Sequence, residues 1–214
     1  MLKIKQFEFN HICVNTYILS DETCKALVID PAFSTQSECD EFDEYISEEC
    51  LDIVEVVFTH PHADHLVGGA CIYDKYRIVP KINSHSKDLV AVVSMQAAAI
   101  GFGDFKLCPL NYNLEEGENV CVGNMSFDVM YMPGHADGSV CLYSTSEKVL
   151  FTGDVLFRSS IGRTDFPTGD YDTLINNIKN RIFVLPDDVK IYPGHGCRTS
   201  VKFERNFNPF FKAN

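Results

Sequence analysis

Three histidines and an aspartate fall within six positions at the end of a predicted strand. The run 58–69 reads F-T-H-P-H-A-D-H-L-V-G-G and contains His60, His62, Asp64 and His65. It follows the strand-forming run 53–58, so these side chains lie in the turn between a buried strand and a helix. A turn, unlike one strand face or one helix stripe, can direct all four side chains to a common point. Because neutral imidazole and carboxylate bind zinc, iron and manganese, the run predicts a metal site.

Two more histidines and a second aspartate stand in similar positions later in the chain. His135 follows the predicted strand 125–131 in M-P-G-H, and His195 follows the strand 189–192 in Y-P-G-H-G. Between them, Asp154 ends the sequence F-T-G-D. Any one of these histidines alone would be read as a turn or core residue. Their shared placement at strand ends instead favours one site, because strand ends meet at one edge of a sheet.

Seven donors exceed what one tetrahedral ion needs, and they suit two ions that share a bridging carboxylate. Two metals about 3.5–4 Å apart hold a hydroxide between them and lower its pKa toward neutrality. The same ions polarise a carbonyl and stabilise a leaving thiolate or alkoxide. The donor set therefore predicts a hydrolase that needs no side-chain nucleophile.

Composition limits the partners of this chain. Its 214 residues carry 18 Lys and Arg against 30 Asp and Glu, a formal net charge of -12. That balance argues against nucleic acid and against an anionic membrane surface, but not against a small anionic substrate. No signal-type N-terminus or membrane-spanning stretch is visible, so a cytoplasmic location is expected. The nine cysteines include no C-x-x-C pair and are expected to be buried free thiols. Nothing in the sequence sets an oligomeric state.

The elements that must position the donors form two β-rich halves flanked by helices. Strands are expected at 2–9, 13–19, 25–30, 53–58, 81–83, 118–122, 125–131, 139–144, 148–153 and 189–192. Helices are expected at 37–49, 65–76, 88–100, 171–181 and 200–207. No linker or repeat separates the halves. Residues 1–214 are therefore expected to form a single domain of two packed sheets with helices outside.

Four motifs resemble those of the metallo-β-lactamase superfamily, and within it the glyoxalase II-like hydrolases. T-H-P-H-A-D-H at 59–65 matches T-H-x-H-x-D-H, and P-G-H-A-D-G-S at 133–139 resembles P-G-H-T-x-G-S, with Ala136 in place of the usual Thr. F-T-G-D-V-L-F at 151–157 matches F-T-G-D-x-L-F, and 193–196 matches P-G-H-G. The resemblance covers nearly the whole chain. It implies an α/β fold, a four-layer αβ/βα sandwich of two mainly antiparallel or mixed sheets packed face to face, with the site at the lip between them.

The resemblance also implies a role for each donor. The first metal would be held by His60, His62 and His135, and the second by Asp64, His65 and His195, with Asp154 as the bridge. Asp64 would also orient the hydroxide or accept its proton. Asp30 matches an acidic residue that orients ligands, although its Asp-Pro sequence fits a simple turn equally well. Two divalent ions are implied, with zinc expected and iron or manganese as alternatives.

Two departures from glyoxalase II bear on the substrate. Glyoxalase II carries a further C-terminal helical domain that contacts glutathione, whereas this chain ends at Asn214 and looks more like the short bacterial glyoxalase II-like proteins. Arg163 aligns with a substrate-gripping Lys of glyoxalase II, but Asp165 stands at the position of its Tyr. Arg163 either binds a substrate carboxylate or pairs with Asp165 as a loop clamp, and the clamp is slightly favoured.

The resulting hypothesis is a dinuclear metal hydrolase of small thioesters, of the S-2-hydroxyacyl-thiol type. The main alternative is a persulfide dioxygenase of the same fold, which uses one iron on two His and one Asp, here His60, His135 and Asp154. A β-lactam hydrolase ranks lower, because its common zinc-only subclasses carry Cys where Asp154 stands. A non-enzymatic scaffold ranks lowest, because all seven donors are intact. His11, His85 and Cys197 match no ligand position.

Overall fold

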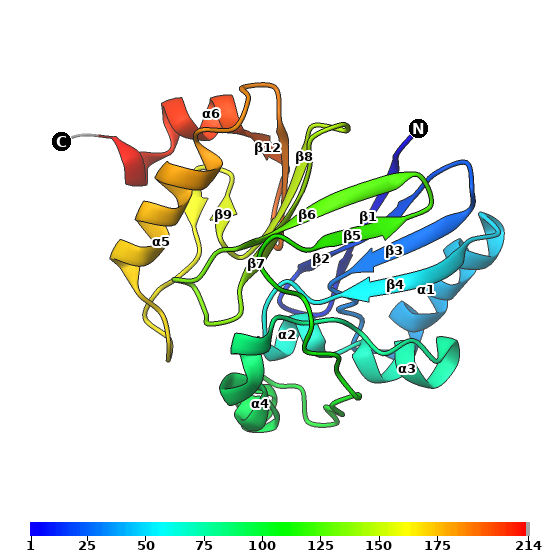
Figure 1. Cartoon of the computed structure of the whole chain (residues 1–214). Helices are drawn as coiled ribbons and strands as arrows, with labels where there is room; N and C mark the ends of the chain where they lie inside the picture. The colour runs from blue at the N-terminus through cyan, green and yellow to red at the C-terminus, as the bar shows by residue number, and fades with distance from the viewer. Residues whose placement is uncertain (213–214) are drawn as a thin grey trace.

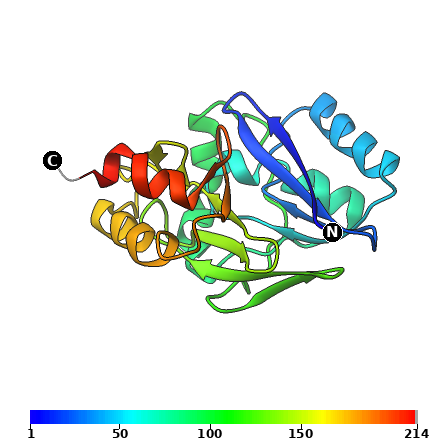
Figure 2. The same ribbon diagram turned by 90° about the horizontal axis from the view of Figure 1, so that it is seen from above.

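The computed structural model describes residues 1–212 and shows two β-sheets packed face to face, with helices on both outer faces (Figures 1 and 2). The first sheet has the order β1-β2-β3-β4. Its strands are β1 Lys3–Phe9, β2 Val14–Ser20, β3 Lys25–Ile29 and β4 Asp52–Val57. β1, β2 and β3 form an antiparallel meander, whereas β4 runs parallel to β3 because a helix crosses over between them.

The second sheet has the order β12-β11-β8-β7-β6-β5. Its strands are β5 Asn119–Val122, β6 Met125–Tyr131, β7 Val140–Ser144, β8 Val149–Gly153, β11 Lys190–Pro193 and β12 Thr199–Ser200. β8 and β11 are parallel, and the other neighbours are antiparallel. A separate two-stranded ribbon joins β9 Leu156–Phe157 to β10 Ser160–Ile161.

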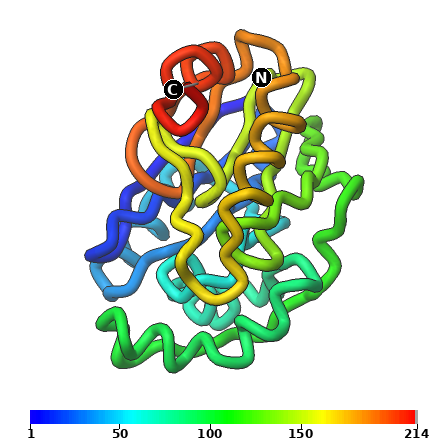
Figure 3. The backbone as a smooth tube through the Cα atoms, turned by 90° about the vertical axis from the view of Figure 1, so that its left-hand side faces the viewer, coloured from blue at the N-terminus to red at the C-terminus, as the bar shows by residue number. Residues whose placement is uncertain are grey.

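The helices cover the two outer faces and one end of the sandwich. They are α1 Gln36–Glu48, α2 Ala63–Leu66, α3 Gly69–Tyr76, α4 Lys87–Ala99, α5 Tyr171–Asn177 and α6 Val201–Phe207, with a π-helical turn at Ile178–Ile182 and 3-10 turns at Ser84–Ser86 and Pro209–Phe211. α1 begins in a capping box, in which Thr35 and Glu38 each accept a backbone N–H of the other. The connection from α4 to β5, green in Figure 3, runs around one end of the molecule.

Apolar side chains fill three layers of this sandwich. Between the sheets lie Leu27, Ile29, Val57, Phe127, Leu142 and Phe151. Outside the first sheet, α1 and α3 contribute Phe42, Ile46 and Ile72 against Ala26, Val28 and Val56. Outside the second sheet, Leu174, Ile178 and Val201 pack against Leu150 and Ile191. Successive residues of β3 therefore face opposite layers, as the two-residue period of a strand requires. The expected four-layer αβ/βα sandwich with mixed sheets is confirmed.

Three expected elements differ in detail. The helix expected at 65–76 is two helices, because Gly68 packs on the Pro31 carbonyl, where a Cβ would overlap the oxygen. The strand expected at 81–83 is only a pair of isolated bridges from Lys81 to Val57 and to Asn111. The helix expected at 171–181 becomes π-helical from Ile178.

The cysteine expectation was partly wrong. All nine cysteines are free, but five are exposed: Cys13, Cys24, Cys50, Cys121 and Cys197. The first three occupy tight turns, with φ of 62°, 59° and 51°, so they lie between the buried elements and not inside them. Within residues 1–212, none of the helices has the length and apolar character needed to cross a membrane.

Candidate metal centre

The first donor group consists of three imidazoles from two loops. His60 and His62 follow β4, and His135 follows β6. His135 Nε2 lies 2.9 Å from His62 Nδ1, and the three residues offer nitrogens within 4.8 Å of one another. The second ring nitrogens of two of these residues are held by the protein, since His135 Nδ1 lies 2.8 Å from the Arg163 carbonyl oxygen and His60 Nδ1 lies 3.1 Å from Thr59 Oγ1. These contacts orient the other nitrogens toward the group's centre.

The second donor group combines a carboxylate with two imidazoles. Asp64 and His65 lie in the short helix α2, and His195 follows β11. Asp64 Oδ2 lies 3.8 Å from His65 Nε2 and 3.5 Å from His195 Nε2. His195 Nδ1 donates to the Cys13 carbonyl at 3.1 Å, which fixes Nε2 as the nitrogen that faces Asp64.

Asp154, directly after β8, lies between the two groups. Its Oδ2 is 3.7 Å from His135 Nε2 in the first group and 3.5 Å from His195 Nε2 in the second. Its Oδ1 is 3.4 Å from His65 Nε2. Gly194 leaves room for this carboxylate, because a Cβ there would collide with Oδ1. A carboxylate that touches both groups stands where a bridging ligand is needed.

Asp30 holds the second group from behind. Its carboxylate accepts hydrogen bonds from the backbone N–H and the hydroxyl of Thr59, both at 2.7 Å, and lies 2.9 Å from His65 Nδ1. Its φ of 49° places it in the Asp-Pro turn as well. Asp30 thus stands in its Asp-Pro turn and also contacts His65, whose second ring nitrogen, Nε2, is left to face the site.

Burial sets the pKa values of His60 and His62 in the first group, whereas neighbouring carboxylates set the pKa of His65 in the second. Burial lowers the pKa of His62 to about 4 and that of His60 well below its usual value. Burial also acts to lower the pKa of His65, but the carboxylates of Asp154, Asp30 and Asp64 outweigh it and raise that pKa well above its usual value. For Asp154 the balance is the mirror image: burial acts to raise its pKa, but the neighbouring His65 outweighs burial and the pKa falls well below its usual value.

The residues present fit divalent metal ions. Across residues 1–212, the buried polar atoms without a hydrogen-bond partner include His60 Nε2 and Asp154 Oδ1. Leaving such atoms unpaired destabilises a fold by about 1–3 kcal/mol each, and coordination to a cation removes that cost. Imidazole and carboxylate oxygen are the donors that such ions take.

A cavity of about 400 Å³ opens over the donors. Its wall is mainly apolar and is formed by Ile12, Ile100, Phe157, Ile161 and Phe166, with Gln96, Ser160 and Arg163 as polar members. Arg163 makes a bidentate pair with Asp165, with Nε–Oδ1 at 2.7 Å and Nη2–Oδ2 at 2.6 Å, and it lies over the Phe166 ring. The structure thus shows the loop clamp, at the rim of the cavity.

Two supporting residues were not identified from the sequence. Asn10 donates from its amide to the Asp64 carbonyl at 3.1 Å, and Gln96 Oε1 accepts the Ala63 N–H at 3.0 Å. Both contacts join segments far apart in the chain, so no local motif marks them. His11 and His85 are exposed and lie outside the donor groups.

The chain belongs to the metallo-beta-lactamase superfamily, whose sequence model matches residues 14–195, a span that includes all seven donors. It is therefore a protein of the metallo-hydrolase class, with a His/Asp cluster suited to divalent metals.

Two curated relatives point to different reactions within this superfamily. Hydroxyacylglutathione hydrolase GloC of Haemophilus influenzae is 35% identical over 93% of this chain and 93% of its own length. The mitochondrial persulfide dioxygenase ETHE1 of Homo sapiens is 31% identical over 92% of this chain and 71% of its own length.

Two solved structures share the whole fold. The B3 metallo-beta-lactamase BLEG-1 superposes with a TM-score of 0.89 at 29% identity, covering 99% of this chain and 100% of that one. TTHA1623, in a di-iron-bound form, superposes with a TM-score of 0.85 at 28% identity, covering 96% and 99%. The second likeness shows that this fold can hold two iron ions.

Proposed function

We propose that the protein is a metal-dependent hydrolase of small thioesters, of the S-2-hydroxyacyl-thiol type. The observation that carries the proposal is the position of Asp154, whose oxygens lie within 3.7 Å of histidines from both donor groups. A shared carboxylate suits two ions and not one. The similarity to a hydroxyacylglutathione hydrolase over nearly the full length of both chains supports the thioester substrate.

Two divalent ions held by the seven donors would supply an activated hydroxide and a Lewis acid for the thioester carbonyl. The chain's own residues do the rest. Asp64 stays ionised, because His65 and His195 outweigh burial and keep its pKa low, so its carboxylate can accept a proton at neutral pH. The apolar wall of the cavity excludes bulk water, and this strengthens each electrostatic contact with the reacting carbonyl.

The cavity matches the acyl end of such a substrate. At about 400 Å³ it lies near the lower end of small-molecule sites, so it has room for an acyl group and sulfur, with the thiol carrier extending outward. Arg163 at its rim is already paired with Asp165, so its positive charge is neutralised and attracts a carboxylate on the thiol carrier only weakly. We therefore expect the protein to recognise the acyl group of the substrate and not its thiol carrier.

The test is hydrolysis of S-D-lactoylglutathione and of acyl thioesters of smaller thiols by the chain reconstituted separately with zinc, iron and manganese. Elemental analysis of the same samples gives the number of ions per chain. Two ions and turnover that disappears on chelation and returns on reconstitution are expected. Absence of thioester turnover in every two-metal form would overturn the proposal.

The persulfide dioxygenase is the second candidate, favoured by the similarity to ETHE1 and by the subset His60, His135 and Asp154 within the donor cluster. One iron per chain, even after metal supplementation, together with oxygen uptake on glutathione persulfide, would assign the protein to this reaction. A chain that binds two ions and takes up no oxygen would eliminate it.

A further inference from the structure

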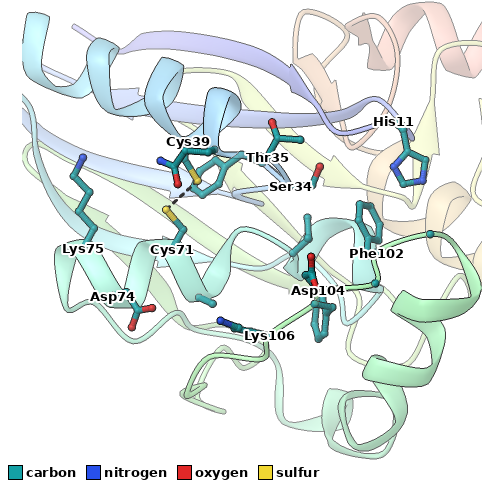
Figure 4. Close-up of a pocket in the computed structure, with 17 residues that line it drawn as sticks. His11, Ser34, Thr35, Cys39, Cys71, Asp74, Lys75, Phe102, Asp104 and Lys106 are labelled. Carbon is teal, nitrogen blue, oxygen red and sulfur yellow. Dashed lines mark hydrogen bonds between the residues drawn. The ribbon is translucent and has the colours of Figure 1, made fainter.

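A second and larger cavity, of about 1000 Å³, lies along α1, α3 and the segment that follows α4 (Figure 4). We call it the helix groove, and its lining includes Ser34, Thr35, Cys39, Cys71, Lys75 and Lys106. It contains none of the seven donors. The proposed function therefore leaves it without a role.

Two thiols face each other in the wall of the helix groove. Cys39 on α1 directs its Sγ at the Sγ of Cys71 on α3, and the two atoms are 3.0 Å apart (Figure 4). A disulfide bond is about 2.05 Å long, so bond formation requires an approach of only about 1 Å. The exposed cysteines, such as Cys24 and Cys50, have no such partner among the contacts of residues 1–212.

The two thiols are not equivalent. Cys39 is 8% exposed, whereas Cys71 is half-buried and opens to the groove. The hydrogen bond from Cys39 lowers the pKa of Cys71, and the same bond raises the pKa of Cys39. The charges around Cys71 oppose one another, because Asp43 and Asp74 act to raise its pKa, whereas Lys75, which is paired with Asp43, acts to lower it. Accessibility and the hydrogen bond from Cys39 thus both make Cys71 the nucleophile and Cys39 the resolving thiol.

We propose that Cys39 and Cys71 form a redox-active dithiol that low-molecular-weight disulfides oxidise to an intramolecular disulfide. The Cys71 thiolate attacks the disulfide RSSR and forms a mixed disulfide, releasing one thiolate, RS⁻. Cys39 then attacks Cys71 Sγ, loses its proton and releases the second RS⁻. The protein loses two electrons and two protons, and RSSR becomes two RSH.

The lining of the helix groove suits a zwitterionic disulfide. Lys75 and Lys106 supply positive charge, and Asp74 and Asp104 supply negative charge, around the hydroxyls of Ser34 and Thr35. A peptide-type disulfide carries both ammonium and carboxylate groups, so Asp74 and Asp104 can attract the first and Lys106 the second, whereas Lys75 is already paired with Asp43. The two sulfur atoms belong to different helices, so oxidation also ties α1 to α3.

The test uses the full, metal-loaded chain exposed to oxidised glutathione at graded ratios to reduced glutathione. Peptide mapping without reduction then identifies the products. A Cys39–Cys71 linked peptide is expected to form at least ~10-fold faster than mixed disulfides on Cys24 and Cys50, because its attacking thiol accepts a hydrogen bond from a resolving partner 3.0 Å away. The linked form should also have the higher Tm, since the crosslink constrains the unfolded chain.

Two variants separate the roles. Cys39→Ser should stop at a mixed disulfide on Cys71, and Cys71→Ser should leave Cys39 reduced under the same conditions. Cys24→Ser is the matched control and should oxidise like the unaltered chain. The proposal is overturned if the unaltered chain yields no linked peptide, or if Cys71 reacts no faster than Cys24 and Cys50. These outcomes do not depend on thioester hydrolysis, so they can fail or succeed separately from the proposed function.

Discussion

The two donor groups lie side by side, yet they differ in charge before any metal binds. In the first group, burial keeps His60 and His62 neutral, with the pKa of His62 at about 4. In the second group, burial is outweighed by carboxylates, and the pKa values of His65 and His195 are both raised. Burial thus favours the neutral, lone-pair-donating form of His60 and His62, whereas the carboxylates around His65 and His195 favour the protonated form of those rings.

The difference comes from what stands behind each ring. His60 and His135 rest on uncharged oxygens, a hydroxyl and a carbonyl. His65 instead rests on the Asp30 carboxylate and faces Asp154. Histidine is therefore prepared for metal binding in two ways, with neutral oxygens behind it in the first group and carboxylates around it in the second. Substitutions at several residues test this difference.

The largest effect is expected from the residue that the two groups share. Asp154→Ala removes the oxygens near His65, His135 and His195, the one carboxylate that lies between the two groups. Thioester hydrolysis should fall by at least ~10³-fold, and elemental analysis should show fewer than two ions per chain. Asp188→Ala, which removes an exposed partner of Lys148, is the control and should leave both quantities unchanged. Full activity of Asp154→Ala would show that Asp154 does not bridge.

Asp30→Asn should affect the second group selectively. The change keeps the shape of the side chain but removes the charge that orients His65. Metal affinity at the second group should fall roughly 10–100-fold, the usual effect of losing a ligand's supporting partner. Competition with a chelator measures it. Asp21→Asn alters another buried aspartate, which holds the turn at Thr23, and should leave metal affinity intact. Equal losses at both metal positions would contradict the distinction between the groups.

The two donor groups should lose their metal ions at different pH values. Because the pKa values of His65 and His195 are raised, these rings are protonated below the raised values, and metal must displace protons there. Affinity at the second group should therefore fall as pH falls, by about tenfold per pH unit for each displaced proton. The first group should be less sensitive above the His62 pKa of about 4. Dialysis at pH 5.5 should leave one ion per chain, and dialysis at pH 8 two. Loss of both ions together would refute this.

The smallest effect is expected at Asp165, at the rim of the cavity over the donors. Asp165→Asn frees the Arg163 guanidinium from an exposed pair. Exposed pairs contribute little to stability, about 0–1 kcal/mol, so folding should be unaffected. KM for a thioester with a carboxylate on its carrier should decrease a few-fold, and KM for a neutral-carrier thioester should stay the same. An equal change in both would place Arg163 outside substrate recognition.

The seven donors could be named from sequence because each lies in a motif at a strand end, and the structure brings all seven together. Their role as ligands stays a prediction. Asp30 could be placed near them only as one of two alternatives, because its contact with His65 crosses from β3 to α2. The roles of Asn10 and Gln96 could not be predicted from sequence, since one lies in an ordinary turn and the other in an ordinary helix. Only the folded chain places them against Asp64 and Ala63.

The same limit applies to the fold. Periodicity located the long strands and the helices within a few residues. The two-residue strands of the β9–β10 ribbon and β12 are too short to have a period. The break between α2 and α3 depends on how closely Gly68 approaches Pro31, a tertiary contact. The Cys39–Cys71 pair joins two helices, so spacing in the sequence could not reveal it.

The attachment of His195 also bears on how the chain folds during synthesis. Its Nδ1 is held by Cys13, and the preceding Pro193 carbonyl accepts from Asn15 and Tyr17, so residues 176 to 182 positions apart meet here. Contacts of such long range form late, since the entropy of closing the loop must be met first. On the ribosome, the first donor group can assemble once β7 and β8 have emerged, whereas the second waits for β11. Metal uptake would then proceed in two stages, with the second ion marking a completely folded chain.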